Sequence, residues 1–355
     1  MKFNNRHFST VIALALALAC ATSIGHAKDS QGQNHGENDD GHSKYTIALF
    51  GDMPYNQIGK AQFPNLIADV NAAHVAFSVF DGDLKAGGDG PCTDSNVYFP
   101  ALANFSAFVQ PLVMVPGDND WTDCWGRYGP GTFTPETADP IERLQHEREL
   151  FFPTRFSLGQ HKLSLTRQYP QYVENARWKY GPVVYITLNM QGSNDNYPYF
   201  GVDGESRPQA EIERERAEEV ARKAANLAWL GDGFAYARQV HAKGVMIIAQ
   251  ADPMFNNENH LVDPRSWDAF PDYVNALRDA AMAFPGQVAF VHGDSHYFKL
   301  DKPLSGPKGG VVANFTRVET FGARNTHWVS ATIDADNPEL FVFTQRLVPA
   351  NIDQP

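Results

Sequence analysis

Five short apolar runs in this chain each end at residues that can ligate a metal ion. Four of the five ends carry a Gly-Asp pair. Each run has the length and composition of a buried strand. Because open α/β sheets bind ligands outside the carboxyl ends of their strands, these residues are expected together at one edge. The runs end at Asp52, Asp83, Asp118, Gln250 to Asp252, and Asp294 to His296.

The side chains at these ends are mostly oxygen donors, with one imidazole from His296. Several carboxylates in one place raise one another's pKa, and a bound divalent cation removes that cost. Oxygen donors suit Mg²⁺, Mn²⁺ or Ca²⁺, whereas imidazole suits Fe or Zn²⁺. Two ions about 3.5–4 Å apart activate water and bind a phosphoryl group. The pattern therefore predicts two divalent metal ions as cofactors.

Alternating strand and helix patterns must position these ends. Apolar residues recur at steps of three and four over 63–73, which indicates a helix. Strand–helix units followed by further strands predict an α/β fold, a four-layer α-β-β-α sandwich with two mixed sheets face to face. Helices are expected over 63–73, 97–109, 141–152, 208–241 and 267–283, and strands over 75–80, 111–115, 161–190, 244–249 and 287–292, with three more strands after 309.

The long helix expected from about Pro208 to His241 has a predicted buried face and a predicted solvated face. Proline suits its first turn. The many Glu and Arg residues are assigned to the solvated face. The buried face is assigned to Val220, Ala224, Leu227 and Leu230.

The N-terminus has the pattern of a secretory signal peptide over residues 1–27. Lys2 and Arg6 precede a short apolar stretch, 11–19, and the small residues Gly25 and Ala27 suit cleavage after Ala27. The stretch is too short to span a bilayer. A periplasmic or secreted protein is expected, without a transmembrane span. An internal core helix and a lipoprotein anchored at Cys20 are the alternatives.

Residues 28–44 lack apolar periodicity and are rich in Gly, Asn, Asp and Ser, which predicts a disordered linker. The histidines His26, His35 and His42 could bind metal loosely, but a solvated linker is favoured. No internal repeat or second linker follows, so one domain is expected over 45–350.

The net charge and the cysteine content limit which binding partners and which cellular compartment fit this sequence. The formal net charge of −12 argues against nucleic-acid binding and against docking on anionic lipid. After a signal peptide, only Cys92 and Cys124 remain, and an exported protein with two cysteines favours one disulfide. Two free thiols are the alternative. No paired Cys/His spacing supports a cysteine metal site.

The order of the five strand ends resembles that of the calcineurin-like metallophosphoesterase superfamily, which includes purple acid phosphatases. Members carry Asp-x-His, Gly-Asp, Gly-Asn-His-Asp/Glu, a lone His and Gly-His-x-His, each after a strand. The resemblance covers about residues 45–300. The matching stretches here are Gly51 to Pro54, Gly82-Asp83, Gly117 to Asp120, Gln250 to Pro253, and Gly293 to His296.

The resemblance implies a role for each metal-ligand position. Asp83 would bridge two ions, and Asp52 and His296 would hold one of them. The second ion would take oxygen donors in place of the family's usual ligands, with Asp252 as an alternative to Gln250. Those second-ion donors are Asp118, Gln250 and Asp294.

The catalytic positions depart from the family pattern. Pro54 replaces the first motif's histidine, and Asn119 replaces the catalytic histidine, so Asn119 can contact phosphate but cannot act as an acid. Asp120 is expected to orient neighbouring groups. His292 is a candidate proton source, with a structural strand-end histidine as the favoured alternative. The stretch 188–196 is interpreted as an ordinary turn, with a pocket-lining loop as the alternative.

Two functions fit this sequence. The first is an exported metal-dependent phosphoesterase that hydrolyses a small phosphate mono- or diester through metal-activated water. The second is a non-catalytic ligand- or metal-binding protein on the same fold, because several family imidazoles are replaced. A surface adhesion module is a third idea, supported only by export and acidity.

Overall fold

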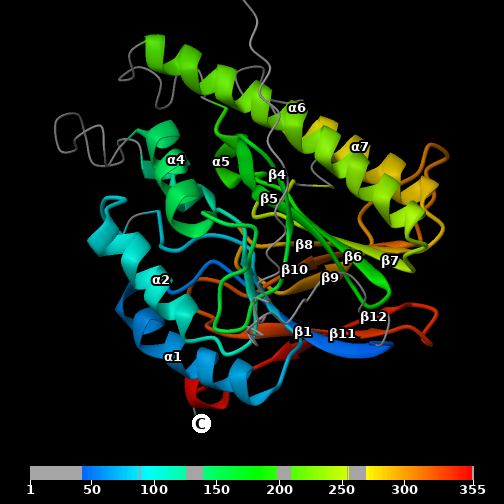
Figure 1. Cartoon of the computed structure of the whole chain (residues 1–355), viewed down its shortest axis with the longest axis horizontal. Coiled ribbons are helices and arrows are strands. Elements are labelled where there is room, and N and C mark those ends of the chain that lie inside the picture. The colour runs from blue at the N-terminus through cyan, green and yellow to red at the C-terminus, as the bar shows by residue number, and fades with distance from the viewer. Residues whose placement is uncertain are drawn as a thin grey trace, which may run out of the picture. The chain divides into compact units, whose positions relative to one another are not determined.

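Two β-sheets form the centre of the fold (Figure 1). The first has five strands in the order β12-β11-β1-β2-β3. β1, β2 and β3 are parallel, and β11 and β12 are added antiparallel. The strands are β1 Lys44–Phe50, β2 Ser78–Phe80, β3 Leu112–Met114, β11 Trp328–Asp334 and β12 Phe341–Arg346.

The second sheet has seven strands in the order β4-β5-β6-β7-β8-β10-β9. Its central strands β6, β7, β8 and β10 are parallel, so their carboxyl ends share one edge. The strands are β4 Thr166–Gln168, β5 Tyr172–Tyr180, β6 Val183–Thr187, β7 Gly244–Ile248, β8 Gln287–His292, β9 Lys299–Asp301 and β10 Phe315–Glu319.

Helices cover the outer faces of both sheets. α1 and α2 lie against the five-stranded sheet, and α6 and α7 against the seven-stranded sheet (Figure 1). The helices are α1 Asn56–Ala72, α2 Phe99–Ser106, α4 Pro140–Phe151, α5 Gly192–Asp195, α6 Gln209–Gln239 and α7 Pro271–Ala283, with shorter helical turns at Asp94–Tyr98, Asp118–Asp120, Thr122–Cys124 and Pro349–Asn351.

Three apolar clusters hold these layers together. Ile47, Val79, Tyr185 and Val291 belong to the cluster between the two sheets. The other two clusters lie between each sheet and its helices. Complete burial of one such side chain contributes roughly 1.5–3 kcal/mol. The predicted four-layer α-β-β-α arrangement is therefore confirmed.

The structure is a computed structural model that describes residues 42–87, 89–124, 139–197, 209–253, 255 and 269–353. They belong to the unit Glu37–Pro355. The predicted signal peptide, Cys20 and nearly all of the predicted linker lie outside the described residues. Among the helices of the described part, none has both the length and the apolar character needed to cross a membrane.

The buried face of α6 differs from the sequence prediction. Val220 is 61% exposed, whereas Glu215, Glu219 and Arg222 are buried. The prediction of a solvated Glu/Arg face was wrong. Charged residues are rarely buried without partners, so the sequence pattern favoured apolar residues for the buried face. In the structure, Asp195 and Glu218 compensate the charge of Arg222.

Candidate metal centre

Six of the predicted metal-ligand positions come together at the edge where both sets of parallel strands end. Asp52, Asp83 and Asp118 follow β1, β2 and β3 of the first sheet. The second sheet supplies residues that follow β7 and β8. These residues are Gln250, Asp294 and His296. They contact the three aspartates through hydrogen bonds, an ion pair and close packing. We call these six residues the metal centre.

Asp83 lies in the middle of the metal centre and accepts three hydrogen bonds. The backbone N–H of Asn119 donates to Asp83 Oδ1 at 3.1 Å. The Asn119 side-chain amide and the Tyr55 hydroxyl donate to Asp83 Oδ2 at 2.6 and 2.7 Å. Asn119 therefore acts here as a donor to Asp83, the carboxylate expected from the sequence to bridge two ions.

Asp52 joins the two sheets. Its Oδ2 accepts a hydrogen bond from the backbone N–H of Asp294 at 2.9 Å. Its Oδ1 faces His296 Nε2 at 3.5 Å and the Tyr55 hydroxyl at 3.3 Å. Burial would lower the pKa of His296, but its contact with Asp52 raises it above its ordinary value.

Gln250 connects Asp118 with Asp294. Its side-chain nitrogen lies 3.4 Å from Asp118 Oδ1 and 3.4 Å from Asp294 Oδ1. Its side-chain oxygen accepts a hydrogen bond from the backbone N–H of Gly192 at 2.5 Å. An amide nitrogen cannot ligate a metal ion. Coordination by Gln250 would therefore require its amide to rotate so that the oxygen faces the carboxylates.

The backbone at the metal centre adopts conformations that side chains disfavour. The φ angles of Asp52, Asp83, Asp294 and His296 are 51°, 68°, 78° and 70°. Such left-handed residues cost roughly 1–3 kcal/mol each and cluster at functional sites. The surrounding fold therefore holds these four residues in place at an energetic cost.

Glycine is required where the backbone passes a carboxylate of the metal centre. A Cβ atom on Gly117 would lie 2.0 Å from Asp83 Oδ1, and one on Gly293 would lie 2.1 Å from Asp52 Oδ2. Real Cβ atoms do not come this close, so larger residues would displace these carboxylates. The Gly-Asp pairs in the sequence are therefore packing requirements as well as turns.

Burial and mutual repulsion make three carboxylates of the metal centre difficult to ionise. Burial, followed by the charges of Asp118 and Asp52, raises the pKa of Asp83 well above its usual range. The same causes raise the pKa of Asp294. Burial, assisted by Asp123, raises the pKa of Asp118 to about 7.

The described residues provide little compensating positive charge. Within that part of the chain, no Lys or Arg side chain forms an ion pair with Asp52, Asp83, Asp118 or Asp294. Lys85 is buried nearby, and burial lowers the pKa of its amine despite the charges of Asp120 and Asp83. Four carboxylates and one imidazole therefore fit a bound divalent cation, which would supply the missing charge.

Asp120 connects the loops that carry Asp83 and Asp118. It accepts hydrogen bonds from the backbone N–H groups of Leu84 at 2.6 Å and Gly117 at 2.8 Å. The predicted disulfide Cys92–Cys124 is confirmed, with Cα atoms 5.7 Å apart, and joins the same two loop regions. β2 and β3 are neighbours, so the disulfide lies beside the metal centre.

The 188–196 loop reaches the metal centre, which favours the pocket-lining alternative over an ordinary turn. The Ser193 hydroxyl lies 2.8 Å from Asp118 Oδ2 and 2.8 Å from Asp123 Oδ1. A Cβ atom on Gly192 would lie 2.6 Å from Asp118 Oδ2. Residues 193–196 all have φ between 46° and 59°, a left-handed turn that L-residues adopt only under constraint.

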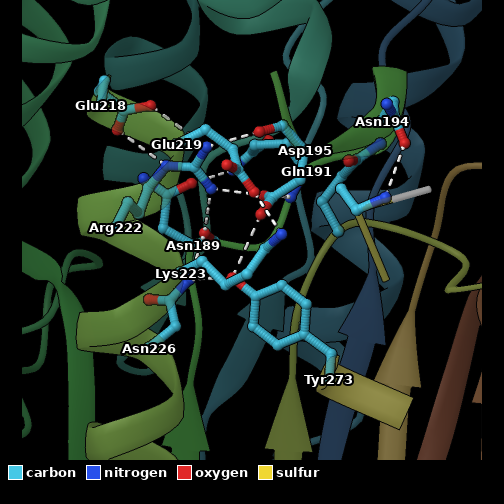
Figure 2. Close-up of polar contacts among 12 residues, drawn as sticks. Asn189, Gln191, Asn194, Asp195, Glu218, Glu219, Arg222, Lys223, Asn226 and Tyr273 are labelled. Atoms are coloured by element: carbon cyan, nitrogen blue, oxygen red, sulfur yellow. Dashed lines mark hydrogen bonds and ion pairs between the residues drawn. The ribbon is translucent and has the colours of Figure 1, made fainter. Parts of the chain in front are cut away.

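A buried network on α6 provides that constraint (Figure 2). Arg222 donates to the carboxylate of Asp195, to the Asp195 backbone carbonyl at 2.7 Å, and to Glu218 at 2.8 Å. Asn226 and Tyr273 complete the contacts, and Arg222 also packs over the Trp121 ring at 5.2 Å. We call this the Arg222 network. It fixes the loop that presents Ser193 to the metal centre.

His292 and Asp252 occupy a different place from the metal centre. His292 is completely buried, and its Nδ1 donates to the Gly293 carbonyl at 2.8 Å. The backbone N–H of Asp252 lies 3.3 Å from Asp294 Oδ2. Their carboxylate and imidazole groups instead approach Glu319. The described structure therefore separates these two predicted site residues from the other six.

Sequence reasoning missed two side chains that contact the metal centre. Tyr55 lies one residue after the first motif, and burial raises the pKa of its hydroxyl well above the ordinary value, with Asp83 and Asp52 adding to the shift. Ser193 lies in a loop that was interpreted as an ordinary turn, with a pocket-lining loop as the alternative and no role given to Ser193 itself. The signal available for Tyr55 was its position next to the first predicted motif in the sequence. No sequence feature near Ser193 indicated its contact with the metal centre.

Comparison with known proteins gives a structural likeness only. No family model and no curated protein matches the sequence. A dimetal phosphatase from Danio rerio is similar over 86% of this chain and 96% of its own, with 12% identity and a TM-score of 0.51. GAP50, described as the anchor in the inner membrane complex of Plasmodium, gives 11% identity, 86% and 89% coverage and a TM-score of 0.43.

A 5'-nucleotidase from Candida albicans has 10% identity and a TM-score of 0.42, over 84% of this chain and 50% of its own. The likeness to the dimetal phosphatase confirms the metallophosphoesterase-like fold expected from the sequence. At this level of identity it establishes the fold and leaves activity to be argued from the residues of the metal centre.

Proposed function

We propose that this protein is an exported metal-dependent phosphoesterase acting on a small phosphate mono- or diester. The observation that carries the proposal is the convergence of four mostly buried carboxylates and one imidazole without basic partners among the described residues. A fold shared with a dimetal phosphatase supports it. Bound divalent ions would supply a water nucleophile and stabilise phosphoryl charge.

The residues of the metal centre suggest how two ions would be divided. Asp52 and His296 would hold one ion, and Asp83 would lie between the two. Asp118 and Asp294 would hold the second ion, with Gln250 contributing its oxygen after rotation. The predominance of oxygen donors at the second position favours Mg²⁺, Mn²⁺ or Ca²⁺ there over a softer metal.

Two donors beside Asp83 suit contact with a phosphate. The Asn119 amide and the Tyr55 hydroxyl lie 3.3 Å apart, and both presently donate to Asp83. With cations bound at Asp83, these two donors would be available to phosphate oxygens. Tyr55 remains protonated at neutral pH because its pKa is raised, so it can donate a hydrogen bond throughout.

A non-catalytic cation-binding protein is the second candidate, and one observation favours it. Asn119 occupies the position of the family's catalytic histidine, and its amide cannot release a proton to a leaving group. A protein with this substitution would retain ligand binding through the same donors. The two candidates share the metal centre and differ in turnover.

The test uses the full mature chain, stripped of metal and then reloaded separately with Mg²⁺, Mn²⁺, Ca²⁺, Zn²⁺ or Fe²⁺. Hydrolysis of a panel of phosphate mono- and diesters is measured for the wild type and for Asp83→Asn. We expect turnover in the wild type and a loss of roughly 10²-fold or more in the variant. Asp232→Asn, at an exposed position on α6, is the matched control and should retain activity.

The outcomes separate the two candidates. Metal binding that depends on Asp83, without turnover of any ester, would favour the non-catalytic protein. Equal turnover by the wild type and Asp83→Asn would exclude the metal centre as the catalytic site. Absence of both metal binding and turnover would overturn both candidates.

A further inference from the structure

Three potential metal ligands lie beside the metal centre but outside it. Asp252, His292 and Glu319 each place one ligand atom within 4.8 Å of the others. Asp252 follows β7, His292 ends β8 and Glu319 ends β10. These are adjacent parallel strands, so their carboxyl ends bring the three residues together.

The strand register places His292 and Glu319 on the outer face of the seven-stranded sheet. The two residues are direct partners across β8 and β10. Side chains alternate along a strand, and Phe290 and Phe315, at the same parity, belong to the cluster under the outer helices. Val291 and Val318, at the opposite parity, belong to the cluster between the sheets. This group is therefore distinct from the metal centre at the strand edge.

The tautomer of His292 is set by its backbone contact. Nδ1 lies 2.8 Å from the Gly293 carbonyl, which can only accept, so Nδ1 carries the proton. Nε2 consequently presents a lone pair. It is buried and has no hydrogen-bond partner in the described structure. An orphaned buried nitrogen of this kind requires an explanation, since nearly all such groups are satisfied.

The surroundings of His292 favour a cation as the missing partner. Its Nε2 lone pair lies among carboxylate oxygens, within 4.8 Å of one oxygen each of Asp252 and Glu319. A neutral imidazole held by a backbone carbonyl through Nδ1 is the usual form of a metal-binding histidine.

The two carboxylates are already oriented by neighbours. Arg317 lies 3.7 Å from Asp252, and Lys299 lies 3.1 Å from Glu319. Arg317 also forms a bidentate pair with Asp301, so its charge is shared between two carboxylates. The three carboxylates of Asp252, Asp301 and Glu319 thus face two positive groups, those of Arg317 and Lys299. The excess negative charge would favour binding of a cation.

Two of the three ligands are completely buried, which limits access of water to the group. Nearby, the Phe255 ring packs against Phe290 and Phe315, with ring centroids 5.6 and 5.7 Å away. The Arg317 guanidinium lies 5.6 Å from the centroid of the Phe255 ring. A cation in this buried position would be weakly screened and strongly held by its ligands.

We propose that Asp252, His292 and Glu319 bind one divalent transition-metal ion, separate from those of the metal centre. One imidazole and two carboxylates suit Zn²⁺ or Mn²⁺ better than Mg²⁺ or Ca²⁺, which prefer oxygen alone. The ion would tie β7, β8 and β10 together at their carboxyl ends. The Asp252 N–H contact with Asp294 would then connect it to the metal centre. This proposal does not depend on phosphoesterase activity.

The ligand spacing requires an adjustment on binding. Three ligands about 2.0–2.2 Å from one ion lie about 3.3–3.8 Å from one another in tetrahedral or trigonal geometry. The three atoms here lie within 4.8 Å of one another. The side chains must therefore approach one another by up to about 1.5 Å.

The test measures Zn²⁺ stoichiometry and affinity on the full mature chain by titration and elemental analysis. We expect Glu319→Gln and His292→Asn each to lose one bound equivalent that Asp83→Asn retains. Glu339→Gln and His161→Asn, at exposed positions, are the matched controls and should bind as the wild type does. Retention of every equivalent by both site variants would overturn the proposal.

A second measurement covers the case in which the buried substitutions prevent folding. Wild-type crystals soaked in Zn²⁺ should show an anomalous-scattering peak roughly 2.0–2.1 Å from His292 Nε2. The absence of a peak there at saturating Zn²⁺ would overturn the proposal. Zinc bound at His292 without ester hydrolysis by any metal form would reject the proposed enzyme and leave this site standing.

Discussion

The metal centre and the Arg222 network both bury carboxylates, but they compensate the charge in different ways. In the Arg222 network, a completely buried guanidinium lies between Asp195 and Glu218. In the metal centre, the partners of Asp83 and Asp118 among the described residues are hydrogen-bond donors such as Asn119 and Ser193, without a Lys or Arg ion pair. Burial raises the pKa values of these two aspartates.

The difference separates a scaffold from a binding site. A network whose carboxylates pair with a buried guanidinium is complete in the folded chain and can hold the strained 193–196 turn in place. A group of carboxylates without such a cation gains stability when one binds. The two regions meet at the 188–196 loop, where Asp195 belongs to the network and Ser193 contacts Asp118. Four predictions test this comparison.

The largest effect is expected from Arg222→Met. Removing one partner of a buried ion pair leaves an uncompensated charge and costs about 3–5 kcal/mol. Chemical denaturation should show this loss in the free energy of unfolding. Arg214→Met removes an ion pair that is 41% exposed on the arginine side and should change stability by less than about 1 kcal/mol. Similar losses in the two variants would refute the scaffold assignment.

A metal ion should stabilise the wild-type protein. At a concentration 100 times its Kd, a ligand that binds only the folded state adds about 2.7 kcal/mol. Asp83→Asn should remove most of this gain while stabilising the metal-free protein, because it deletes an uncompensated charge. Thermal unfolding with and without Mn²⁺ checks both effects, with Asp232→Asn as control. A metal-free Asp83→Asn protein less stable than the wild type would contradict this interpretation.

Glu147 on α4 is a third case, because it has neither an ion-pair partner nor a hydrogen-bond partner in the described structure. Burial, assisted by Asp120 and Glu174, raises its pKa well above 4.5. Below pH 4.5 the group is protonated in both folded and unfolded states. As the pH rises, only the unfolded state ionises freely, so the folded state loses stability.

Glu147→Gln should therefore be more stable than the wild type at pH 7 to 8, by roughly 1.4 kcal/mol for each unit by which the pKa of Glu147 is higher in the folded than in the unfolded state. The difference should vanish near pH 4. Unfolding midpoints measured across this pH range provide the check, and the exposed Glu149→Gln should show no such trend. A difference that stays constant with pH would exclude ionisation of Glu147 as the cause.

The smallest effect is expected from Ser193→Ala. Its hydroxyl contacts Asp118 and Asp123 but is not itself a predicted ligand. Loss of such a supporting contact weakens metal binding by about tenfold, at the lower end of the usual range. Mn²⁺ titration should show this change in Kd without a change in stoichiometry, and exposed Ser106→Ala serves as control. Loss of one whole bound equivalent of Mn²⁺ would instead indicate that Ser193 is a metal ligand.

Local sequence patterns predicted the layers of the fold because strand and helix periodicity follow directly from which residues are apolar. They also predicted which residues end the parallel strands, and hence Asp52, Asp83, Asp118 and Asp294 as neighbours. The pattern failed on α6, where the buried face contains Glu215 and Arg222. Burial of charge depends on partners distant in the chain, and no local period reveals them.

The sequence by itself determined the four-layer fold, the acidic strand edge and the Cys92–Cys124 pairing, since each follows from local composition and spacing. Only the tertiary structure decided which of these residues share a site. It separated His292 from the metal centre because alternate residues of a strand face opposite sides of the sheet. It also placed Ser193 against Asp118, because Arg222 on α6 holds the loop at Asp195. These segments are distant in the sequence and meet only when α6 packs against the loop.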